Sequence, residues 1–395
     1  MTASRASLRS LDLLNFVLAD VQTGVGPFLA IYLAGRGWNE ERVGVALTAG
    51  GLATIAAQIP AGALIDITEA KRALVALSIA IVAGGALAIA LFPGFSSVIV
   101  AQCAIGAASS SFGPAICAIS LGLVGSAAFD ARQGRNQAAS SAGNVVAALA
   151  MGLLGYFVSE RSVFSFVVVA AIPSLLALRG IKPREIDHRA ARGSGDEPTE
   201  SVRSLLRSRR LVIFMVCAVM FHFANAAMLP LLGEMLAKGK GRSSMMFMSA
   251  CVITTQLVIA GTAGWASSIA ESRGRKPILL VAFAALPIRG VLYTLTSNTV
   301  LLVGIQVLDG VCASIFGVVS VLVIADLTAG TGRFNLTLAA ITTAVGVGAA
   351  LSQVIAGSLV HRVDASVGFL SLAGIAAIAF VILLAGMPET LRRAT

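Results

Sequence analysis

Charged residues are scarce in this sequence. Asp, Glu, Lys and Arg make up 12% of its 395 residues, about half of the ~25% that is usual for soluble domains. Only three histidines are present, His188, His222 and His361, and the sequence contains no H-E-x-x-H pattern and no P-loop. These absences argue against a zinc hydrolase, against ATP-driven work and against an intramembrane enzyme. The alternative of a non-transporting receptor is disfavoured because the sequence shows no folded soluble domain.

Cysteine is also rare, and its spacing excludes a metal cluster. All five cysteines fall inside apolar runs, none is spaced like a metal ligand, and none lies in a polar loop where a disulfide would be useful. They are interpreted as small buried side chains. The sequence therefore predicts no metal site and no cofactor.

What the sequence has in abundance is apolar length. Hydrophobic residues make up 57% of the chain, and the mean hydropathy is +0.90. Runs long enough to cross ~30 Å of hydrocarbon recur throughout, which predicts an all-α integral membrane protein with twelve spans. The expected spans are 11–34, 43–65, 73–92, 96–124, 137–158, 162–180, 211–236, 246–270, 277–297, 300–325, 336–360 and 367–387.

The distribution of Lys and Arg predicts the orientation of these spans. With the N-terminus placed in the cytoplasm, 21 of the 29 basic residues fall in cytoplasmic segments, 7 fall in external loops, and Arg289 lies within a span. Cytoplasmic loops carry an excess of Lys and Arg, so both termini and the polar segment 181–210 are expected in the cytoplasm. This bias accounts for the net charge of +10 without a nucleic-acid partner.

The two halves of the chain look like copies of one another. "QCAIGAASSSFG" (102–113) and "QVLDGVCASIFG" (306–317) share five residues at an offset of 204, and Pro27 and Pro230 are 203 residues apart. Each half holds six expected spans, an even number, so the copies have the same orientation in the membrane. This predicts two parallel-repeat six-helix bundles, 1–180 and 211–395, joined by the cytoplasmic linker 181–210, with a site at their interface.

A short charged loop follows the second expected span of each half. "GALIDITEAKR" (62–72) and "SSIAESRGRKP" (267–277) align at an offset of 205. With the six-plus-six spans, this loop resembles the G-x-x-x-D-x-x-G-[RK]-[RK] motif of the major facilitator superfamily, although the first copy has Glu69 where glycine is usual. The candidate gate residues are Asp66, Lys71, Arg72, Glu271, Arg273, Arg275 and Lys276.

The resemblance implies a secondary transporter that works by alternating access. In the superfamily these loops hold the cytoplasmic ends of the two halves together, and helices 1, 4, 7 and 10 line a central cavity. Ion pairs at a surface are individually weak, about 0–1 kcal/mol, which suits a gate that must open in every cycle. The alternative is that the basic residues only fix the topology.

Four ionisable residues lie inside the expected spans, where a charge is costly and indicates function by default. Asp20 and His222 fall at nearly equivalent depths in helices 1 and 7, and they are followed by Gln22 and Asn225. Asp20 is the candidate proton carrier, and the alternative is a permanently hydrogen-bonded packing residue. For His222 the alternative is a neutral donor to a neighbouring carbonyl.

Arg289 and Asp309 are expected at similar depth in adjacent antiparallel helices, where they would pair as a buried structural ion pair. The sharper alternative is that Arg289 binds an anionic substrate. Gln102 and Gln306 occupy the helix 4 and helix 10 positions at which drug antiporters of the superfamily often have arginine in helix 4. This departure, together with the missing Gly-Pro pair in helix 5, argues against a standard drug–proton antiporter.

We therefore predict a proton-coupled transporter of a small organic solute, with export favoured because the cavity helices carry few fixed charges. The alternative is proton-coupled uptake of an organic anion, and sodium is the alternative coupling ion. The expected partners are the substrate, protons and the lipid bilayer, and a monomer is expected. The expected location is a bacterial inner membrane.

Overall fold

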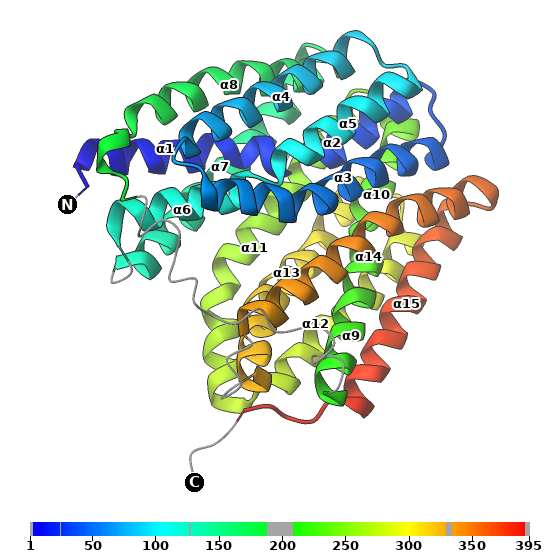
Figure 1. Ribbon diagram of the computed structural model, residues 1–395. Helices are drawn as coiled ribbons and strands as arrows, with labels where there is room; N and C mark the ends of the chain where they lie inside the picture. Colours follow the sequence, from blue (N-terminus) through cyan, green and yellow to red (C-terminus); the bar gives the residue numbers. More distant parts are fainter. Residues whose placement is uncertain (1–2, 24, 126–127, 188–207, 329–333, 392–395) are drawn as a thin grey trace. The chain divides into compact units, whose positions relative to one another are not determined.

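The computed structural model describes residues 3–23, 25–125, 128–187, 208–328 and 334–391, and the regular structure within these ranges is helical (Figure 1). In chain order the helices are α1 (Arg5–Thr23), α2 (Val25–Gly35), α3 (Glu40–Ile67), α4 (Lys71–Leu91), α5 (Phe95–Ser109), α6 (Phe112–Val124), α7 (Phe129–Phe157), α8 (Ser162–Gly180), the 3₁₀ turn Pro183–Glu185, α9 (Arg209–Ala226), α10 (Met228–Lys240), α11 (Ser243–Arg273), α12 (Arg275–Leu295), α13 (Thr299–Thr328), α14 (Phe334–Arg362) and α15 (Ala365–Gly386).

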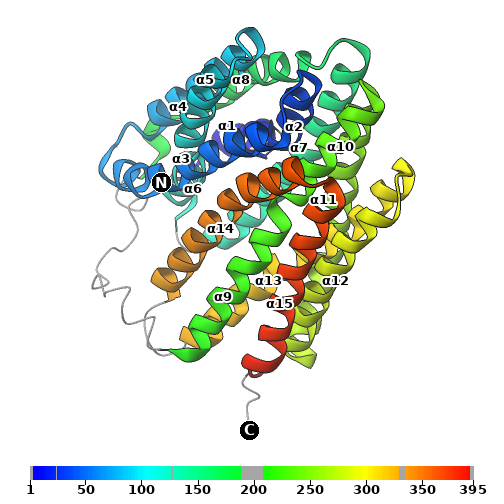
Figure 2. The ribbon, with the colours of Figure 1, turned by 90° about the vertical axis from the view of Figure 1, so that its right-hand side faces the viewer.

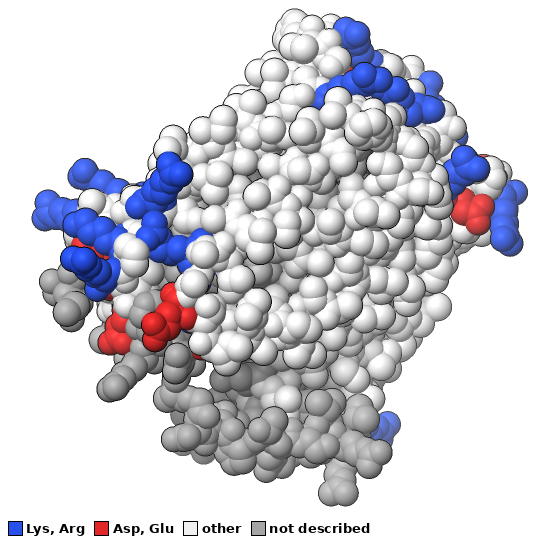
Figure 3. Space-filling view, turned by 45° about the horizontal axis from the view of Figure 1, so that its top comes forward, with Lys and Arg blue, Asp and Glu red and all other residues white. Residues whose placement is uncertain are grey.

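Within the described residues, 11 helices are long and apolar enough to cross a membrane, and Gly26–Gly35 is a shorter apolar helix. This all-helical architecture confirms the predicted fold class, while the side of the membrane on which the termini lie stays a prediction. The first expected span corresponds to α1 followed by the short α2, which is why it is not among the 11. Charged side chains gather at the margins of the face shown in Figure 3, and a wide uncharged surface separates them.

Three expected spans are each divided into two helices. The breaks precede α2, α6 and α10, and a proline occupies the third position of each of these helices: Pro27, Pro114 and Pro230. Proline lacks an N–H group and is tolerated in a first turn, whereas in a helix interior it removes a hydrogen bond. At the second break the Ser110 and Ser111 hydroxyls also donate to the carbonyls of Ala107 and Ala108.

The helices form two compact units. The first unit comprises Met1–Gly37, Ala49–Asp196 and Leu236–Ser249, and the second comprises Trp38–Thr48, Glu197–Met235 and Ala250–Thr395. The predicted domain boundaries at 180 and 211 stay a prediction. Part of the predicted linker, residues 188–207, lies outside the described residues.

Helix packing within the two units follows one pattern, as the internal repeat predicts. In the first unit α1 packs against α7 and α8, and α4 packs against α5 and α8. In the second unit α9 packs against α14 and α15, and α12 packs against α13 and α15 (Figure 2). Each of these pairs has its counterpart in the other half of the chain, so the sequence repeat is also a structural repeat.

The repeated glycine of the two "Q-x-x-x-G" segments has a packing role in both units. A Cβ at Gly106 would lie 2.1 Å from the Gly50 carbonyl oxygen, and one at Gly310 would lie 2.5 Å from Val258 Cβ. Glycine therefore lets α5 approach α3, and it lets α13 approach α11 in the same way. The glycine of the repeat is accounted for by this close helix packing.

Candidate functional site

A buried ion pair joins α1 and α7 in the first unit. The Arg132 guanidinium donates to Asp12 through Nη2 and to Asn136 Oδ1 through Nε at 2.8 Å, and its side chain is only 4% exposed. Arg135 Nη2 also donates to Asp12, at 3.0 Å, from an exposed position. The burial cost of the Arg132 charge is thus offset by a carboxylate and an amide oxygen.

Asn136 is the centre of a wider polar network in the same unit. Its Nδ2 donates to Ser120 Oγ on α6 and to Gln133 Oε1, both at 2.8 Å, while its Oδ1 accepts from Asn15 Nδ2 on α1 at 3.2 Å. Buried polar groups are normally satisfied in this way. The amide therefore ties α1, α6 and α7 together at one level.

A pocket of about 180 Å³ opens beside this network, between α1, α6 and α7. Its polar lining consists of amides and one hydroxyl, and its apolar lining includes Leu18 and Ile116. The polar residues are Asn15, Gln133, Asn136, Gln137 and Ser140. An amide both donates and accepts, so this lining can bind the polar part of an uncharged solute while the apolar wall contacts the rest.

The second unit holds a second buried polar network, built around Arg289 on α12. Arg289 is 1% exposed, and its Nη1 donates to Asp309 Oδ1 on α13 and to Asn225 Oδ1 on α9, each at 2.5 Å. Its Nε donates to the Tyr293 hydroxyl at 2.8 Å, and Thr255 Oγ1 on α11 donates to Asp309 Oδ2 at 3.1 Å. The structure thus brings Arg289, Asp309 and Asn225 together.

Gln306 extends this network along α13. Its Nε2 donates to the Tyr293 hydroxyl at 2.6 Å and to the Leu302 carbonyl at 3.4 Å, and the residue is 0% exposed. Its Oε1 is buried and has no hydrogen-bond partner among the described residues. Gln102, the equivalent residue of the first unit, is buried against Gly50 of α3.

Among the other predicted cavity residues, Asp20 and Gln22 lie on α1 by their backbone, and their side chains fall outside the described residues. His222 is half-buried on α9, and its Nδ1 lies 3.2 Å from the Ala218 carbonyl oxygen. The imidazole packs edge-on against Phe316, with ring centroids 4.6 Å apart. This arrangement agrees with the alternative in which His222 is a neutral donor to a neighbouring carbonyl.

The basic residues of the two charged loops bind the carboxyl ends of neighbouring helices. Lys71 Nζ donates to the Ile65 and Thr68 carbonyls at the end of α3, and Arg275 Nη1 donates to the Ala270 carbonyl near the end of α11. Carbonyls at a helix end have no partner within the helix, and a cation suits their negative potential. Lys71 and Arg275 therefore have the same role in the two units, since each binds the carboxyl end of the helix that precedes its loop.

Arg72 and Lys276, the residues that directly follow Lys71 and Arg275, are also equivalent in the two units. Arg72 donates to the Leu178 and Arg179 carbonyls of α8, and Lys276 Nζ donates to the Leu384 carbonyl of α15. In both pairs the two residues are 204 positions apart in the sequence, whereas the alignment of the two loops uses an offset of 205. The remaining gate candidates, Asp66, Glu271 and Arg273, are exposed.

Two glutamates that follow the last helix of each half bind backbone N–H groups. Glu185 accepts from the Ser4 backbone N–H at 2.9 Å, just before α1, and this bond and those of the nearby hydroxyls lower its pKa to about 2. Glu389 accepts from the backbone N–H groups of Arg275 and Lys276 at the start of α12. Burial opposes ionisation of Glu389, but bonds from four backbone N–H groups lower its pKa.

Several residues of these networks are absent from the sequence-based candidates: Asp12, Asn15, Arg132, Asn136, Tyr293, Asp326 and Glu389. The expected fifth span begins at 137, which puts Arg132 and Asn136 in a loop, whereas α7 begins at Phe129. Their spacing of four residues, on one helix face, was the available signal. Asp326, which pairs with Arg275 at 3.1 Å, had no comparable signal.

Comparison with known proteins shows a consistent likeness. A family model described as the Major Facilitator Superfamily matches residues 11–287. Over 389 residues the chain is 46% identical to a protein named as an uncharacterized MFS-type transporter in two strains of Mycobacterium tuberculosis, and the match covers 97% of this chain and 93% of that protein.

The similar solved structures include transporters of two kinds. The nucleoside transporter NupG matches with a TM-score of 0.74, 16% identity and coverage of 97% of this chain and 99% of that one. A peptide transporter POT in complex with sulfate matches with a TM-score of 0.77, 16% identity and coverage of 96% and 94%. At this identity the likeness shows the fold alone.

Proposed function

Because the chain belongs to the major facilitator superfamily, we propose that it is a secondary transporter that exports a small organic solute by alternating access, driven by protons. Transport of a solute across a membrane is the general activity of this family. The mycobacterial relatives support a bacterial inner membrane as its location. The two six-helix repeats supply the two halves that such a mechanism requires.

The observation that carries the proposed substrate class is the pocket between α1, α6 and α7. Among the described residues its lining combines amides with apolar side chains and includes no Asp, Glu, Lys or Arg. Its volume of about 180 Å³ is below the ~300–1,000 Å³ of typical ligand pockets, so it holds one part of a solute. An uncharged or amphipathic compound with hydrogen-bonding groups fits this lining best.

Gln137 provides a direct test of this substrate class. It lines the pocket, and its one described side-chain hydrogen bond, to Ser141 Oγ at 3.4 Å, is long and exposed. Purified protein is first screened by thermal shift against nucleosides, dipeptides and amphipathic drugs, because a compound that binds the folded state stabilises it. Gln137→Leu is then expected to bind the most stabilising compound roughly tenfold more weakly, the effect of ~1.4 kcal/mol.

Ser141→Ala is the matched control, since it removes the same hydrogen bond without changing the pocket lining. This variant is expected to bind as the parent does. If both variants bind the compound normally, the pocket does not take the substrate and this proposal is wrong.

Proton coupling is proposed to run through Asp20, five residues after Asn15 on α1. A deprotonated carboxylate favours a conformation in which water or a ligand reaches it, whereas a protonated one is neutral and lets the site close and reorient. Asp20→Asn imitates the neutral form. We expect uphill accumulation under an imposed pH gradient to be lost, while counterflow without a gradient persists.

This prediction is checked in proteoliposomes that contain the most stabilising compound of the screen. Uphill transport by Asp20→Asn at the parent rate would place the coupling group elsewhere, and His222→Gln would then be measured next. The direction of flux under the same gradient separates export from uptake. Replacing the proton gradient with a sodium gradient tests the alternative coupling ion.

Uptake of an organic anion through Arg289 is less well supported. Arg289 is 1% exposed and already donates to Asp309, Asn225 and Tyr293. Binding a substrate carboxylate would require one of these bonds to break in the buried interior. A structural role for the pair agrees better with this set of contacts.

A further inference from the structure

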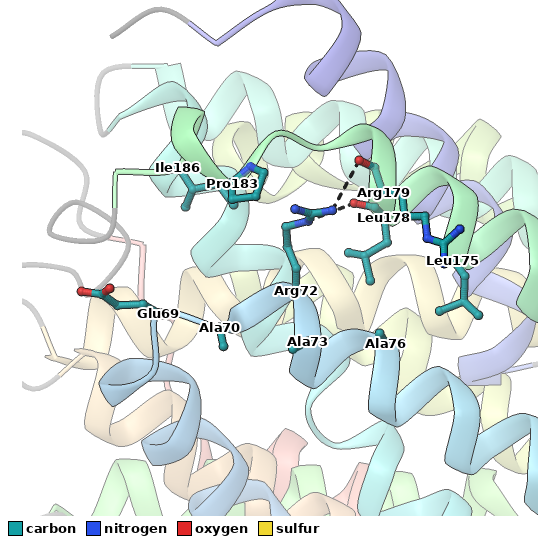
Figure 4. Close-up of a pocket in the computed structure, with 10 residues that line it drawn as sticks. All are labelled: Glu69, Ala70, Arg72, Ala73, Ala76, Leu175, Leu178, Arg179, Pro183 and Ile186. Carbon is teal, nitrogen blue, oxygen red and sulfur yellow. Dashed lines mark hydrogen bonds between the residues drawn. The ribbon is translucent and has the colours of Figure 1, made fainter.

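A second cleft, of about 450 Å³, lies in the first unit between the start of α4 and the end of α8. None of its described lining residues comes from α1 or α7. Figure 4 shows its residues, which come from the loop before α4, from α4 and α8, and from the segment that follows α8. None of them lines the pocket of about 180 Å³ between α1, α6 and α7. The proposed transport function does not use this cleft.

The polar end of the cleft contains an arginine that is held in place. Arg72 Nε donates to the Leu178 carbonyl at 3.0 Å and Nη2 donates to the Arg179 carbonyl at 3.3 Å (Figure 4). Its third nitrogen, Nη1, has no partner among the described residues. A guanidinium fixed in this way is preorganised for a phosphate oxygen.

A second arginine and one glutamate are the other charged residues in the described lining of the cleft. Arg179 lines it from the end of α8, is exposed, and forms no ion pair with a described residue. Glu69 lies at the rim, and in Figure 4 its carboxylate points away from the Arg72 guanidinium. Among the described lining residues, two cations and one anion leave one net positive charge, which matches a singly charged phosphodiester better than a polyanion.

The remainder of the lining is apolar and continues into the outer surface of the helices. Ala73 and Ala76 on α4 face Leu175 and Leu178 on α8 across the cleft. On the same helices, close to these residues in the sequence, large apolar side chains are exposed, namely Leu77 at 57%, Ile172 at 59% and Leu176 at 59%. A hydrocarbon chain could follow this surface from the cleft toward the bilayer core.

We propose that this cleft binds the phosphodiester headgroup of an anionic phospholipid, with its acyl chain along α4 and α8. Basic pockets between membrane helices bind such headgroups, and the volume of the cleft lies within the ~300–1,000 Å³ of ligand sites. A bound lipid bridges the start of α4 and the end of α8, the two segments that Arg72 joins. It therefore stabilises the first unit.

The test measures which lipids the purified protein retains. The full-length protein is equilibrated in detergent with equal amounts of phosphatidylglycerol and phosphatidylcholine, and the bound lipids are counted by mass spectrometry. The parent is expected to retain phosphatidylglycerol preferentially. Arg179→Gln should lower this preference about fivefold, the factor that corresponds to ~1 kcal/mol per basic residue near an anionic surface.

Ala73→Phe tests the shape of the cleft with both arginines intact. The ring would occupy the apolar part, so the preference for phosphatidylglycerol should fall although the helix-end contacts of Arg72 remain. Arg161→Gln is the matched control, because Arg161 is exposed at the opposite end of α8, and it should retain lipid as the parent does.

Three results of the lipid comparison would overturn the proposal: no preference for phosphatidylglycerol in the parent, an equal loss in Arg161→Gln, or full retention in both cleft variants. Inorganic phosphate is added in a separate arm at millimolar concentration. If it displaces the lipid completely, the cleft binds a free anion and the assignment to phospholipid is wrong. A failure here leaves the proposed transport function unaffected, because that is measured through Gln137 and Asp20.

Discussion

Arg289 illustrates how one buried charge determines the side chains around it. Its guanidinium contacts residues of α9, α12 and α13, and every described partner in this network is polar. Removing one member of a buried ion pair leaves the other charge uncompensated, which costs more than the pair itself contributes. The same reasoning applies to Asp12 and Arg132 in the first unit.

A double-mutant cycle at this pair is the first stability prediction. Arg289→Gln and Asp309→Asn should each lower the free energy of unfolding by about 3–5 kcal/mol, and the double variant should recover much of the loss. Unfolding in SDS followed by circular dichroism provides the measurement.

Thr255→Val is the control for this cycle, since it removes one hydrogen bond to Asp309 without a change of charge. Its expected cost is about 1 kcal/mol. Normal folding of Arg289→Gln with loss of ligand binding would contradict the structural role and favour an anion site.

At the scale of helices, the charged loops have the same structural role in both units. Lys71 and Arg275 bind the end of the preceding helix, and the residues after them, Arg72 and Lys276, bind the end of the last helix of their half. These contacts lie within each unit. The predicted role of the loops in closing the cytoplasmic side is therefore an additional proposal, and it must operate alongside the binding of helix ends.

Glu185 gives an element-scale prediction for pH. Its folded pKa of about 2 is below the ~4.3 of an unfolded glutamate. Its contribution to stability is therefore fully present above pH ~4.3 and is lost as pH falls toward 2. Glu185→Gln should melt at a lower temperature than the parent at neutral pH, and the difference should shrink progressively below pH ~4.3.

The measurement is a series of melting curves between pH 7 and pH 3. Glu69→Gln serves as the control, because Glu69 is exposed and makes no hydrogen bond to a described residue. If the difference in melting temperature between the parent and Glu185→Gln stays constant down to pH 3, the ionised carboxylate of Glu185 does not anchor α1 and the prediction is wrong.

The helices were more predictable than the networks that join them. Span positions follow from apolar length, and the repeat follows from matched segments such as those around Gly106 and Gly310, because both depend on local sequence. The amide network around Asn136 depends on how α1, α6 and α7 pack, which no local pattern encodes. Prolines that follow the helix breaks are visible in the sequence, but Pro60, Pro173 and Pro287 lie within continuous helices, so proline alone does not predict a break.

The repeat also organises the molecule as a whole. Equivalent helix pairs occur in both units, yet the polar networks differ: the first unit has an ion pair between α1 and α7, and the second has one between α12 and α13. Duplication thus preserved helix packing, which requires small residues at fixed places, while the buried charges diverged.

The orientation of the whole chain is the last prediction, and the local geometry decides where it can be measured. Gly274 is unsuitable for a cysteine probe, because its φ is +112° and a Cβ would lie 2.4 Å from Glu389 Oε2. Ser272 and Arg161 are exposed instead. The excess of Lys and Arg predicts that Ser272→Cys faces the cytoplasm and that Arg161→Cys faces outward.

In intact cells a membrane-impermeant thiol reagent should label Arg161→Cys and leave Ser272→Cys unlabelled, and inside-out vesicles should give the opposite result. The parent is the control, since its five cysteines are buried or half-buried. Labelling of Ser272→Cys in intact cells would show that the chain has the opposite orientation to the predicted one. The two charged loops would then lie outside, where they could not close the cytoplasmic side, and Glu185 and Glu389 would anchor the outer ends of their units.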